Sequence, residues 1–188
     1  MVRPKVFQKK GQPISEYLLC TVSLLHPRQG FVQTSTFFAR RSLFMEVPFT
    51  KGLKRNQETD WLLRAIPHTG TEVVILEKVL AIFHNEKKTH RIGSSTDWEY
   101  TFQWAVDNKA LFTPRALAVF FSTICLGVVM KQPAASKNAL LLWRACLKHG
   151  KITPLVVFIF FRNLCLVPTY RRLSPRWVMR LASTIIYR

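Results

Sequence analysis

The chain has 188 residues, of which 48% are apolar, and it carries a formal net charge of +18 at pH 7. This length suits one ordinary domain that buries a core, so the composition argues against a globally disordered chain. The positive charge favours anionic partners, such as nucleic acid, anionic lipid or phosphorylated substrates. The four cysteines lie far apart in apolar runs with no CxxC pair, which favours buried free thiols in a reducing compartment.

The positive charge is divided unevenly along the chain. All ten acidic residues lie at or before Asp107, whereas residues 108–188 contain 13 Lys and Arg and no Asp or Glu. We therefore expect a change of character near residue 110. The expected regions are a flexible basic lead-in over 1–14, a folded region over 15–110 and a basic, apolar helical region over 111–188.

The first 110 residues have the pattern of alternating helices and strands. Ser15, Asn56 and Asp97 each precede a helical pattern and are good N-capping residues. Runs rich in β-branched and aromatic residues predict strands over 31–39 and 71–83. These patterns predict a small α/β unit with at least two strands.

Proline and glycine mark where the helices of this region are expected to end. A short helical turn over 40–47 is followed by Pro48-Phe49, which should stop it. The helix that begins at Asn56 should end at Pro67 and Gly70.

The C-terminal region is nearly all helical in pattern. Its longest uncharged run covers 15 residues, from Ala116 to Met130. A membrane-spanning helix needs roughly 20 apolar residues, so these helices either pack on each other or lie in a membrane interface. The predicted helices, separated by prolines and Gly150, cover residues 114–130, 136–149, 154–168 and 175–187.

An acidic cluster lies at the start of the helix that follows Asn56. Glu58 and Asp60 fall in its first turn, where the helix dipole stabilises negative charge. Asp60 and Arg64 form an i,i+4 pair, and Trp61 belongs to an apolar stripe. The spacing alone is thus explained by helix stability and packing.

The segment GFVQTSTFFARRSLFMEVPFTKGLKRNQETDWLLRA resembles the second, acceptor-side half of family 2 (GT-A type) glycosyltransferases. The resemblance covers roughly residues 15–105 and consists of an ordered series of short motifs. They are Thr34-Ser35-Thr36, Arg40-Arg41, Val47-Pro48-Phe49, Gly52-Leu53 and Gln57-Glu58-Thr59-Asp60-Trp61 with Arg64. The fold implied is α/β, a partial GT-A domain followed by a mainly α-helical C-terminal region.

The resemblance implies a general base in the acidic cluster. Glu58 stands where the family has an Asp that takes the proton of the acceptor hydroxyl. The glutamate adds a methylene, which moves the carboxylate outward. Asp60 and Arg64 would orient this base.

The resemblance also implies acceptor-binding and donor-side residues. Trp61, Trp98 and Trp104 are candidates for acceptor binding, for example by stacking on a sugar, although tryptophans at helical spacing are also typical of a core. His84, at the end of a predicted strand, is a candidate for contact with the donor diphosphate or its metal. A partly buried histidine at a strand end is the alternative interpretation.

The family binds its nucleotide sugar through an N-terminal half, where a D-x-D motif holds Mg²⁺ or Mn²⁺. This sequence has no D-x-D motif, and no strand–glycine-rich loop–helix unit precedes residue 30. We therefore expect no cofactor in this chain and no transfer activity by the chain alone. Either the chain is a truncated product, the interpretation that we favour, or another chain supplies the donor site. The metal and the nucleotide sugar are implied for the full-length family only.

These features predict a glycosyltransferase-like protein of bacterial surface polysaccharide biosynthesis, making exopolysaccharide, lipopolysaccharide or capsule. The acceptor would be a saccharide or a lipid-linked sugar, and the expected location is the cytoplasm or the inner face of the cell membrane. The basic face of Arg171, Arg172, Arg176 and Arg180 could contact anionic lipid. The alternatives are a non-catalytic membrane-associated protein and a nucleic-acid-binding protein, the latter disfavoured because no nucleic-acid motif is present.

Overall fold

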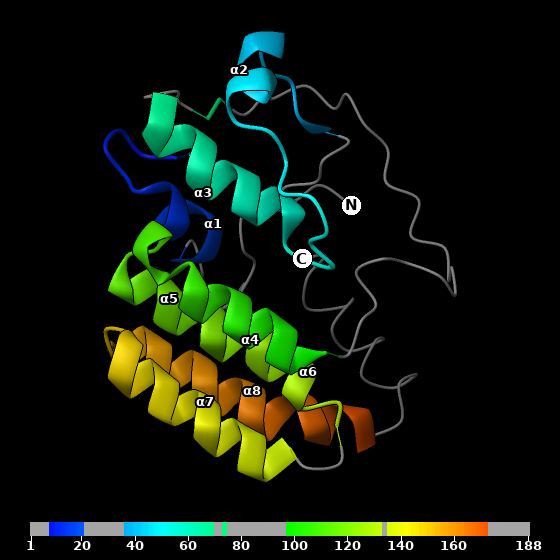
Figure 1. Ribbon diagram of the computed structural model, residues 1–188. Helices are drawn as coiled ribbons and strands as arrows, with labels where there is room; N and C mark the ends of the chain where they lie inside the picture. The colour runs from blue at the N-terminus through cyan, green and yellow to red at the C-terminus, as the bar shows by residue number, and fades with distance from the viewer. Residues whose placement is uncertain (1–7, 21–35, 70–72, 75–96, 133–134, 173–188) are drawn as a thin grey trace, which may run out of the picture.

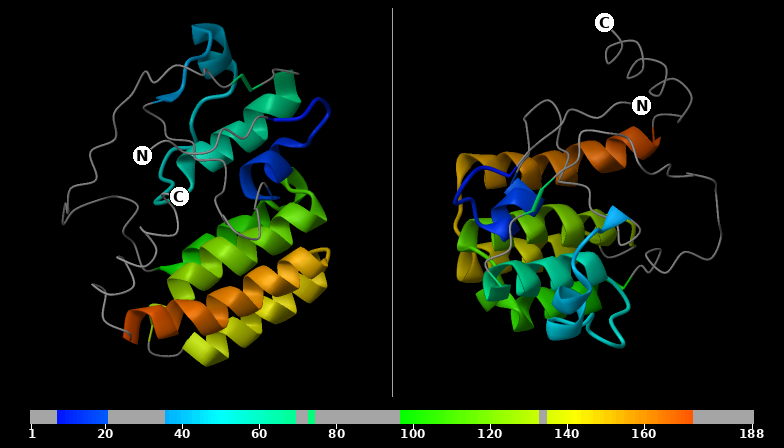
Figure 2. Two further views of the ribbon diagram at one scale, coloured as in Figure 1. Left: turned by 180° about the vertical axis from the view of Figure 1, so that it is seen from behind. Right: turned by 90° about the horizontal axis from the view of Figure 1, so that it is seen from above.

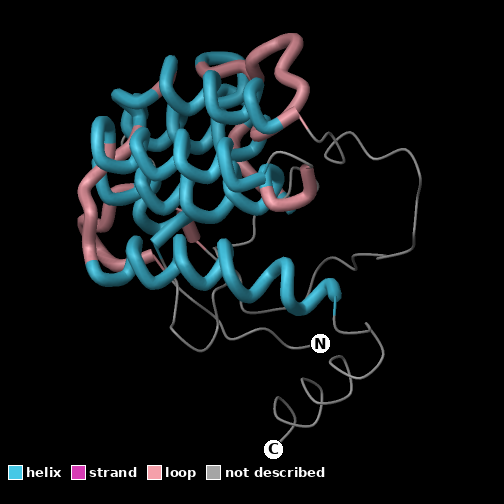
Figure 3. The backbone as a smooth tube through the Cα atoms, turned by 90° about the horizontal axis from the view of Figure 1, so that it is seen from below, coloured by secondary structure: helices cyan, strands magenta, loops and turns pink. Residues whose placement is uncertain are grey.

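A computed structural model of the chain describes residues 8–20, 36–69, 73–74, 97–132 and 135–172. All regular structure in these residues is helical (Figures 1 and 3). The α-helices are α1 (Ile14–Cys20), α2 (Arg41–Glu46), α3 (Gln57–Thr69), α4 (Trp98–Asp107), α5 (Pro114–Phe120), α6 (Leu126–Val129), α7 (Ala135–His149) and α8 (Pro154–Arg172). A 3₁₀ turn, η3 (Lys109–Leu111), follows α4, and a π-helical turn, η4 (Phe121–Cys125), joins α5 to α6.

The expected α/β fold is wrong for the part of the chain that the structure describes, which is all-α. Residues 37–39, in the described end of the predicted strand over 31–39, form no regular element. A run of β-branched and aromatic residues forms a stable strand only beside other strands, and none lies in the described residues. Phe37 packs on Trp61 of α3 instead, with 5.4 Å between ring centroids. Nearly all of the predicted strand over 71–83 lies outside the described residues.

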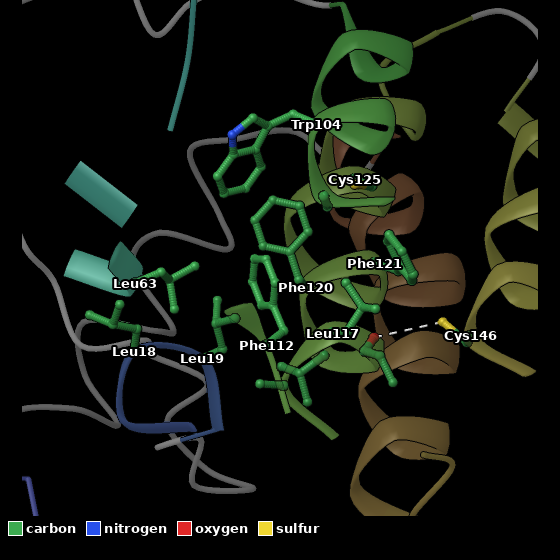
Figure 4. Close-up of a cluster of buried hydrophobic side chains, with 14 of the residues drawn as sticks. Leu18, Leu19, Leu63, Trp104, Phe112, Leu117, Phe120, Phe121, Cys125 and Cys146 are labelled. Carbon is green, nitrogen blue, oxygen red and sulfur yellow. Dashed lines mark hydrogen bonds between the residues drawn. The ribbon is translucent and has the colours of Figure 1, made fainter. Parts of the chain in front are cut away.

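The C-terminal helices form the larger part of the structure, and the central one is the continuous helical run from α5 through η4 to α6 (Figures 1 and 2). Other helices cover this run on several sides: α1 packs on α5, α4 on η4 and α6, and α7 and α8 on η4. Its residues are therefore almost all buried, which explains why the longest uncharged stretch of the sequence falls here. Figure 4 shows Leu117, Phe120, Phe121 and Cys125 of this run among the buried side chains.

The predicted C-terminal helices are confirmed where the structure describes them. The helices over 114–130, 136–149 and 154–168 are present, and α8 continues to Arg172. The fourth predicted helix, over 175–187, lies outside the described residues. No helix among the described residues is both long enough and apolar enough to cross a membrane.

Two of the three predicted helix starts are confirmed. Asp97 caps α4 by accepting a hydrogen bond of 2.9 Å from the backbone N–H of Tyr100, and Asn56 directly precedes α3. The N-cap predicted at Ser15 is wrong, because α1 already begins at Ile14. The Ser15 hydroxyl instead accepts a hydrogen bond of 3.1 Å from the backbone N–H of Thr113, 98 residues away.

The helix α3 ends later than the sequence predicts. Pro67 lies inside the helix, which continues to Thr69. A proline removes one backbone donor from a helix but does not stop it where only the last turn follows.

Helices from both sides of residue 110 share one hydrophobic core. Close to that residue, the Thr113 hydroxyl donates to the Glu16 carboxylate at 3.0 Å, and Arg115 pairs with the same carboxylate at 3.5 Å. The helix α1 is thus fixed to the start of α5 by polar contacts as well as by apolar packing. The division into regions at residue 110 stays a prediction.

Candidate functional site

The acidic cluster lies at the N-terminus of α3, where the backbone makes a sharp change of direction. Asn56 has a positive φ of 65°, a left-handed conformation that asparagine tolerates better than most residues. The Asn56 carbonyl accepts the first helical hydrogen bond, 2.8 Å from the backbone N–H of Asp60. This local geometry turns the chain into α3 and places Glu58 in its first turn.

Asp60 is a buried carboxylate whose hydrogen bonds fasten α3 to the preceding loop. Its Oδ2 accepts from the Thr50 hydroxyl at 2.8 Å and from Arg64 at 3.0 Å (Nε) and 2.9 Å (Nη2). Arg64 Nη2 also donates to the carbonyl of Pro48 at 2.9 Å. With only 3% of Asp60 exposed, these three donors compensate for the loss of hydration of its charge.

Trp61 fastens the same loop to α3 by a second set of contacts. Its indole N–H donates to the carbonyl of Val47 at 2.6 Å. Its ring lies 4.9 Å from that of Phe44 and 5.6 Å from that of Phe49, between ring centroids, in stacked arrangements. Trp61 is only 3% exposed, so a sugar could stack on it only if this aromatic cluster opened. Its predicted acceptor-binding role stays a prediction.

Glu58 is half-buried, and it lies on a different side of α3 from Asp60. Residues two apart on a helix do not face each other, whereas residues three and four apart do. Glu58 thus shares a face with Trp61 rather than with Asp60. Asp60 and Arg64 can influence Glu58 by fixing the position of the helix that carries it.

The loop before α3 also contacts the start of α4. The backbone N–H of Lys54 donates to the Tyr100 hydroxyl at 3.1 Å, and the Lys54 ammonium lies 5.5 Å from the centre of the Tyr100 ring. On the other side of the loop, the Gln57 side-chain amide donates to the carbonyl of Leu53 at 2.7 Å. Tyr100 therefore brings a half-buried aromatic ring and a hydroxyl close to the acidic helix start.

Sequence reasoning missed Thr50 and Tyr100, which both contact this site. Thr50 follows the Val47-Pro48-Phe49 motif directly, so its place in the resembling segment was the available signal. Tyr100 lies between Trp98 and Trp104 in the sequence, and helical spacing alone gives no signal that distinguishes it from them.

Trp98 and Trp104 are core residues in the structure, 7% and 6% exposed. The ring of Trp98 packs on Phe102 at 6.0 Å. The ring of Trp104 lies 5.9 Å from that of Phe112 and 5.7 Å from that of Phe120 (Figure 4). Packing against these aromatic rings explains the positions of both tryptophans. The acceptor-binding role of Trp98 and Trp104 stays a prediction.

Nothing in the described part of the chain fits the divalent metal that the resemblance implies for the full-length family. No group of three or more His, Cys, Asp or Glu side chains that could hold a metal ion occurs there. His84, the predicted donor-side residue, lies outside the described residues. No step of the chemistry below is therefore assigned to a metal.

The cysteines of the core are chemically protected. Cys125 and Cys146 are buried free thiols, and burial raises the pKa of Cys146 to about 11 although its contact with Ser122 opposes the rise. Burial also raises the pKa of Cys125 and brings that of half-buried Cys20 to about 11. Because the thiolate is the nucleophile, these three residues are unsuited to catalysis near neutral pH. Cys165 is exposed, contrary to the expectation of buried cysteines throughout.

A separate open depression of about 710 Å³ lies between α1 and the starts of α5 and α8. Its polar lining includes Glu16, Thr113, Arg115, Lys151 and Thr153. The charges of Glu16 and Arg115 are already paired with each other across it. The start of α3 therefore remains the better candidate for a site.

Comparison of the chain with protein-family models, with curated proteins and with solved structures gave no match. The functional argument therefore depends on the residues and contacts described above.

Proposed function

We propose that this chain forms the acceptor-side part of a nucleotide-sugar-dependent, inverting glycosyltransferase of bacterial surface polysaccharide biosynthesis. The observation that carries the proposal is the set of contacts between α3 and the loop before it. Val47 and Pro48 accept hydrogen bonds from Trp61 and Arg64, and Thr50 donates to Asp60. Two of the motifs that resemble the family, Val47-Pro48-Phe49 and the acidic cluster with Arg64, thus also meet in space.

These contacts support a specific role for Glu58. Its helix is fastened to the preceding loop by the bonds of Asp60 to Thr50 and of Arg64 to Pro48, and by the stacked ring of Trp61. A general base needs such support, because a displacement of about 1 Å can cost roughly 10²-fold in rate. Glu58 is half-buried, so it is held in place without being sealed from substrate.

In the proposed reaction, Glu58 takes the proton of the acceptor hydroxyl as that oxygen attacks the anomeric carbon of the donor sugar. The bond from the anomeric carbon to the nucleoside diphosphate breaks in the same step. Asp60 and Arg64 are positioning residues, because they hold the helix and do not face Glu58. The nucleotide sugar is held by residues other than those described.

The acceptor is proposed to be a saccharide or a lipid-linked sugar. Tyr100 and Lys54 support this choice, because an aromatic ring and a cation lie together beside the acidic helix start. An aromatic ring packs on the apolar face of a sugar, and a cation suits the phosphate of a lipid-linked acceptor. We propose that the reaction occurs in the cytoplasm, at the inner face of the cell membrane.

The test is to fuse the chain to the donor-binding half of a family 2 glycosyltransferase and to measure transfer from a panel of nucleotide sugars. In an active fusion, Glu58→Gln should lower turnover by roughly 10²–10⁴-fold, because glutamine keeps the shape but cannot accept the proton. Glu99→Gln is the matched control, since Glu99 is also an acid in the first turn of a helix, α4.

The two variants separate catalysis from helix stability. Each removes one first-turn carboxylate, which contributes about 0.3–1 kcal/mol through the helix dipole, so neither variant should unfold and a thermal melt of each checks this. Near-normal turnover of Glu58→Gln would reject the assignment of the base. Loss of turnover in both variants would show that the effect is not specific to Glu58.

A further inference from the structure

The outer sides of α7 and α8 carry several large apolar side chains that no described part of the chain covers. On α7, Leu140 and Leu147 are 51% and 57% exposed. On α8, Phe158 and Phe161 are 42% and 50% exposed. Scattered apolar residues are normal on a surface, whereas a contiguous group marks a site of interaction.

These side chains form one surface, which we call the α7–α8 face and define as Leu140, Trp143, Leu147, Phe158 and Phe161. On α7 the residues follow each other at spacings of three and four, and on α8 at a spacing of three, so each set lies along one side of its helix. The half-buried ring of Trp143 joins the two sets, because it lies 5.9 Å from the ring of Phe161. Figures 1 and 2 show α7 and α8 side by side in an outer layer.

Basic residues share the exposed side of α7 with the leucines. Lys137, Arg144 and Lys148 are all exposed, and they follow each other at spacings of seven and four. No Asp or Glu occurs anywhere in residues 108–188, so this charge has no acidic counterpart in its own region of the sequence. The surface is therefore apolar and cationic at once.

We propose that the α7–α8 face binds the surface of an anionic membrane, with both helices lying in the plane of the interface. Leucine and phenylalanine side chains would enter the boundary between headgroups and acyl chains, and the tryptophan suits the interface itself. Lys137, Arg144 and Lys148 would meet the phosphates of the lipids. This mode of binding needs no helix that crosses the bilayer.

A membrane fits this surface better than two other partners do. In a symmetric pair of chains the α7–α8 faces would bring Lys137, Arg144 and Lys148 together with their own copies, without acids between them. A nucleic acid would meet the basic residues but would leave the exposed leucines and phenylalanines against a polar phosphate backbone. Of these three partners, an anionic lipid surface is the one that satisfies both the charge and the apolar area. The inference does not rest on the proposed sugar transfer.

The experiment measures binding of the full chain to vesicles of phosphatidylcholine with and without phosphatidylglycerol, by flotation. We expect binding only when phosphatidylglycerol is present, and weaker binding as salt is raised. The variant Arg144→Gln with Lys148→Gln should weaken binding by about 25-fold, from about fivefold for each charge. Leu140→Ala with Leu147→Ala should weaken it by about tenfold or more, because buried methylene groups are lost from the interface.

A matched control removes two positive charges elsewhere. Arg41 on α2 and Lys51 in the next loop are exposed, and α2 lies at the end of the molecule opposite α7 and α8 (Figure 1). Arg41→Gln with Lys51→Gln should bind vesicles like the unchanged chain, and far-ultraviolet circular dichroism should show that every variant is folded. Size-exclusion chromatography at several protein concentrations tests for self-association.

Three results would overturn the proposal. One is equal binding to both kinds of vesicle, or none to either. Another is vesicle binding that the two double variants of α7 leave unchanged. Vesicle binding that the Arg41 and Lys51 control lowers as much as the α7 variants do would count in the same way. The last is a dimer that the leucine variants abolish, because the face would then be an interface between copies. Each of these results can occur whether or not the fused enzyme transfers sugar. Failure of the membrane proposal is therefore distinguishable from failure of the proposed function.

Discussion

Gly150 lies between α7 and α8 at a point where the chain passes very close to α5. A Cβ atom added to Gly150 would lie 2.6 Å from the Cβ of Ala118 and 2.9 Å from the carbonyl oxygen of Cys146. Ala118 is fully buried on α5 and has no flexible side chain that could move aside. Substitution of Gly150 by alanine therefore forces the backbone itself to shift.

The size of the effect follows from these distances. Non-bonded carbon atoms are most favourable at about 3.5–4.0 Å, so α5 and the turn at Gly150 would have to separate by roughly 1 Å. Overpacking of this kind typically costs about 1–3 kcal/mol. The alanine also restricts the unfolded chain, which returns about 0.4–1 kcal/mol. We expect Gly150→Ala to lower the free energy of unfolding by about 1–2 kcal/mol.

Gly127 in α6 provides a control with the opposite expectation. A Cβ atom added there meets no atom within 4 Å. Alanine is favoured over glycine inside a helix by roughly 0.5–1 kcal/mol, so Gly127→Ala should raise the free energy of unfolding.

Urea unfolding followed by far-ultraviolet circular dichroism measures both variants, and thermal melts provide a second measure. For a chain of this length, 1 kcal/mol corresponds to about 2–4 °C in Tm. The reasoning would be refuted if Gly150→Ala were as stable as the unchanged chain. It would also be refuted if both variants raised the free energy of unfolding, because the close approach of α5 would then have no measurable consequence.

Three further predictions concern single residues. Asn56→Ala should lower the free energy of unfolding by about 1–2 kcal/mol and Asn56→Gly should not, because φ is positive there; equal losses in urea unfolding would contradict this. Asp60→Asn should lower it by about 1.5–3 kcal/mol, since the buried carboxylate accepts three hydrogen bonds, whereas Glu58→Gln should cost less than 1 kcal/mol; the reverse order would be contrary evidence. In thiol labelling at pH 8, Cys165 should react before Cys146, whose raised pKa keeps it protonated until the pH approaches about 11; rapid labelling of Cys146 in the folded chain would refute its burial.

The helices of the C-terminal region could be predicted from the sequence because their signals are local. The proline at the first position of α8, Pro154, and the long uncharged run across α5, η4 and α6 are readable from neighbouring residues alone. Asp97 was predictable for the same reason, since a capping side chain bonds to a backbone N–H only three residues away.

The local structures that the sequence predicted wrongly depend on contacts with residues distant in the sequence. Ser15 has the side chain of an N-cap, but its hydroxyl accepts from Thr113, 98 residues away. Residues 37–39 belong to a strand-like run, but Phe37 packs on the helix α3. In each case a tertiary contact decided between two local structures that the sequence allowed.

The tryptophans show why a candidate site is harder to predict than a helix. Helical spacing indicated that Trp61, Trp98 and Trp104 lie on particular helix faces, but it carries no information about what covers those faces. Those faces are covered by the rings of residues such as Phe44 and Phe112, which lie in other segments of the chain.

Asp60 and Glu58 stand two residues apart, and their contacts make them separate tests of the proposed function. The bonds of Asp60 to Thr50 and Arg64 hold the loop and α3 together in any folded form of the chain, so a loss of stability in Asp60→Asn is expected whether or not the protein transfers sugar. Glu58 lies on a different side of the helix from that network, and as a first-turn acid it contributes about 0.3–1 kcal/mol through the helix dipole. Turnover is therefore the measurement that distinguishes a general base from an ordinary helix-start acid, and it has to be made on Glu58.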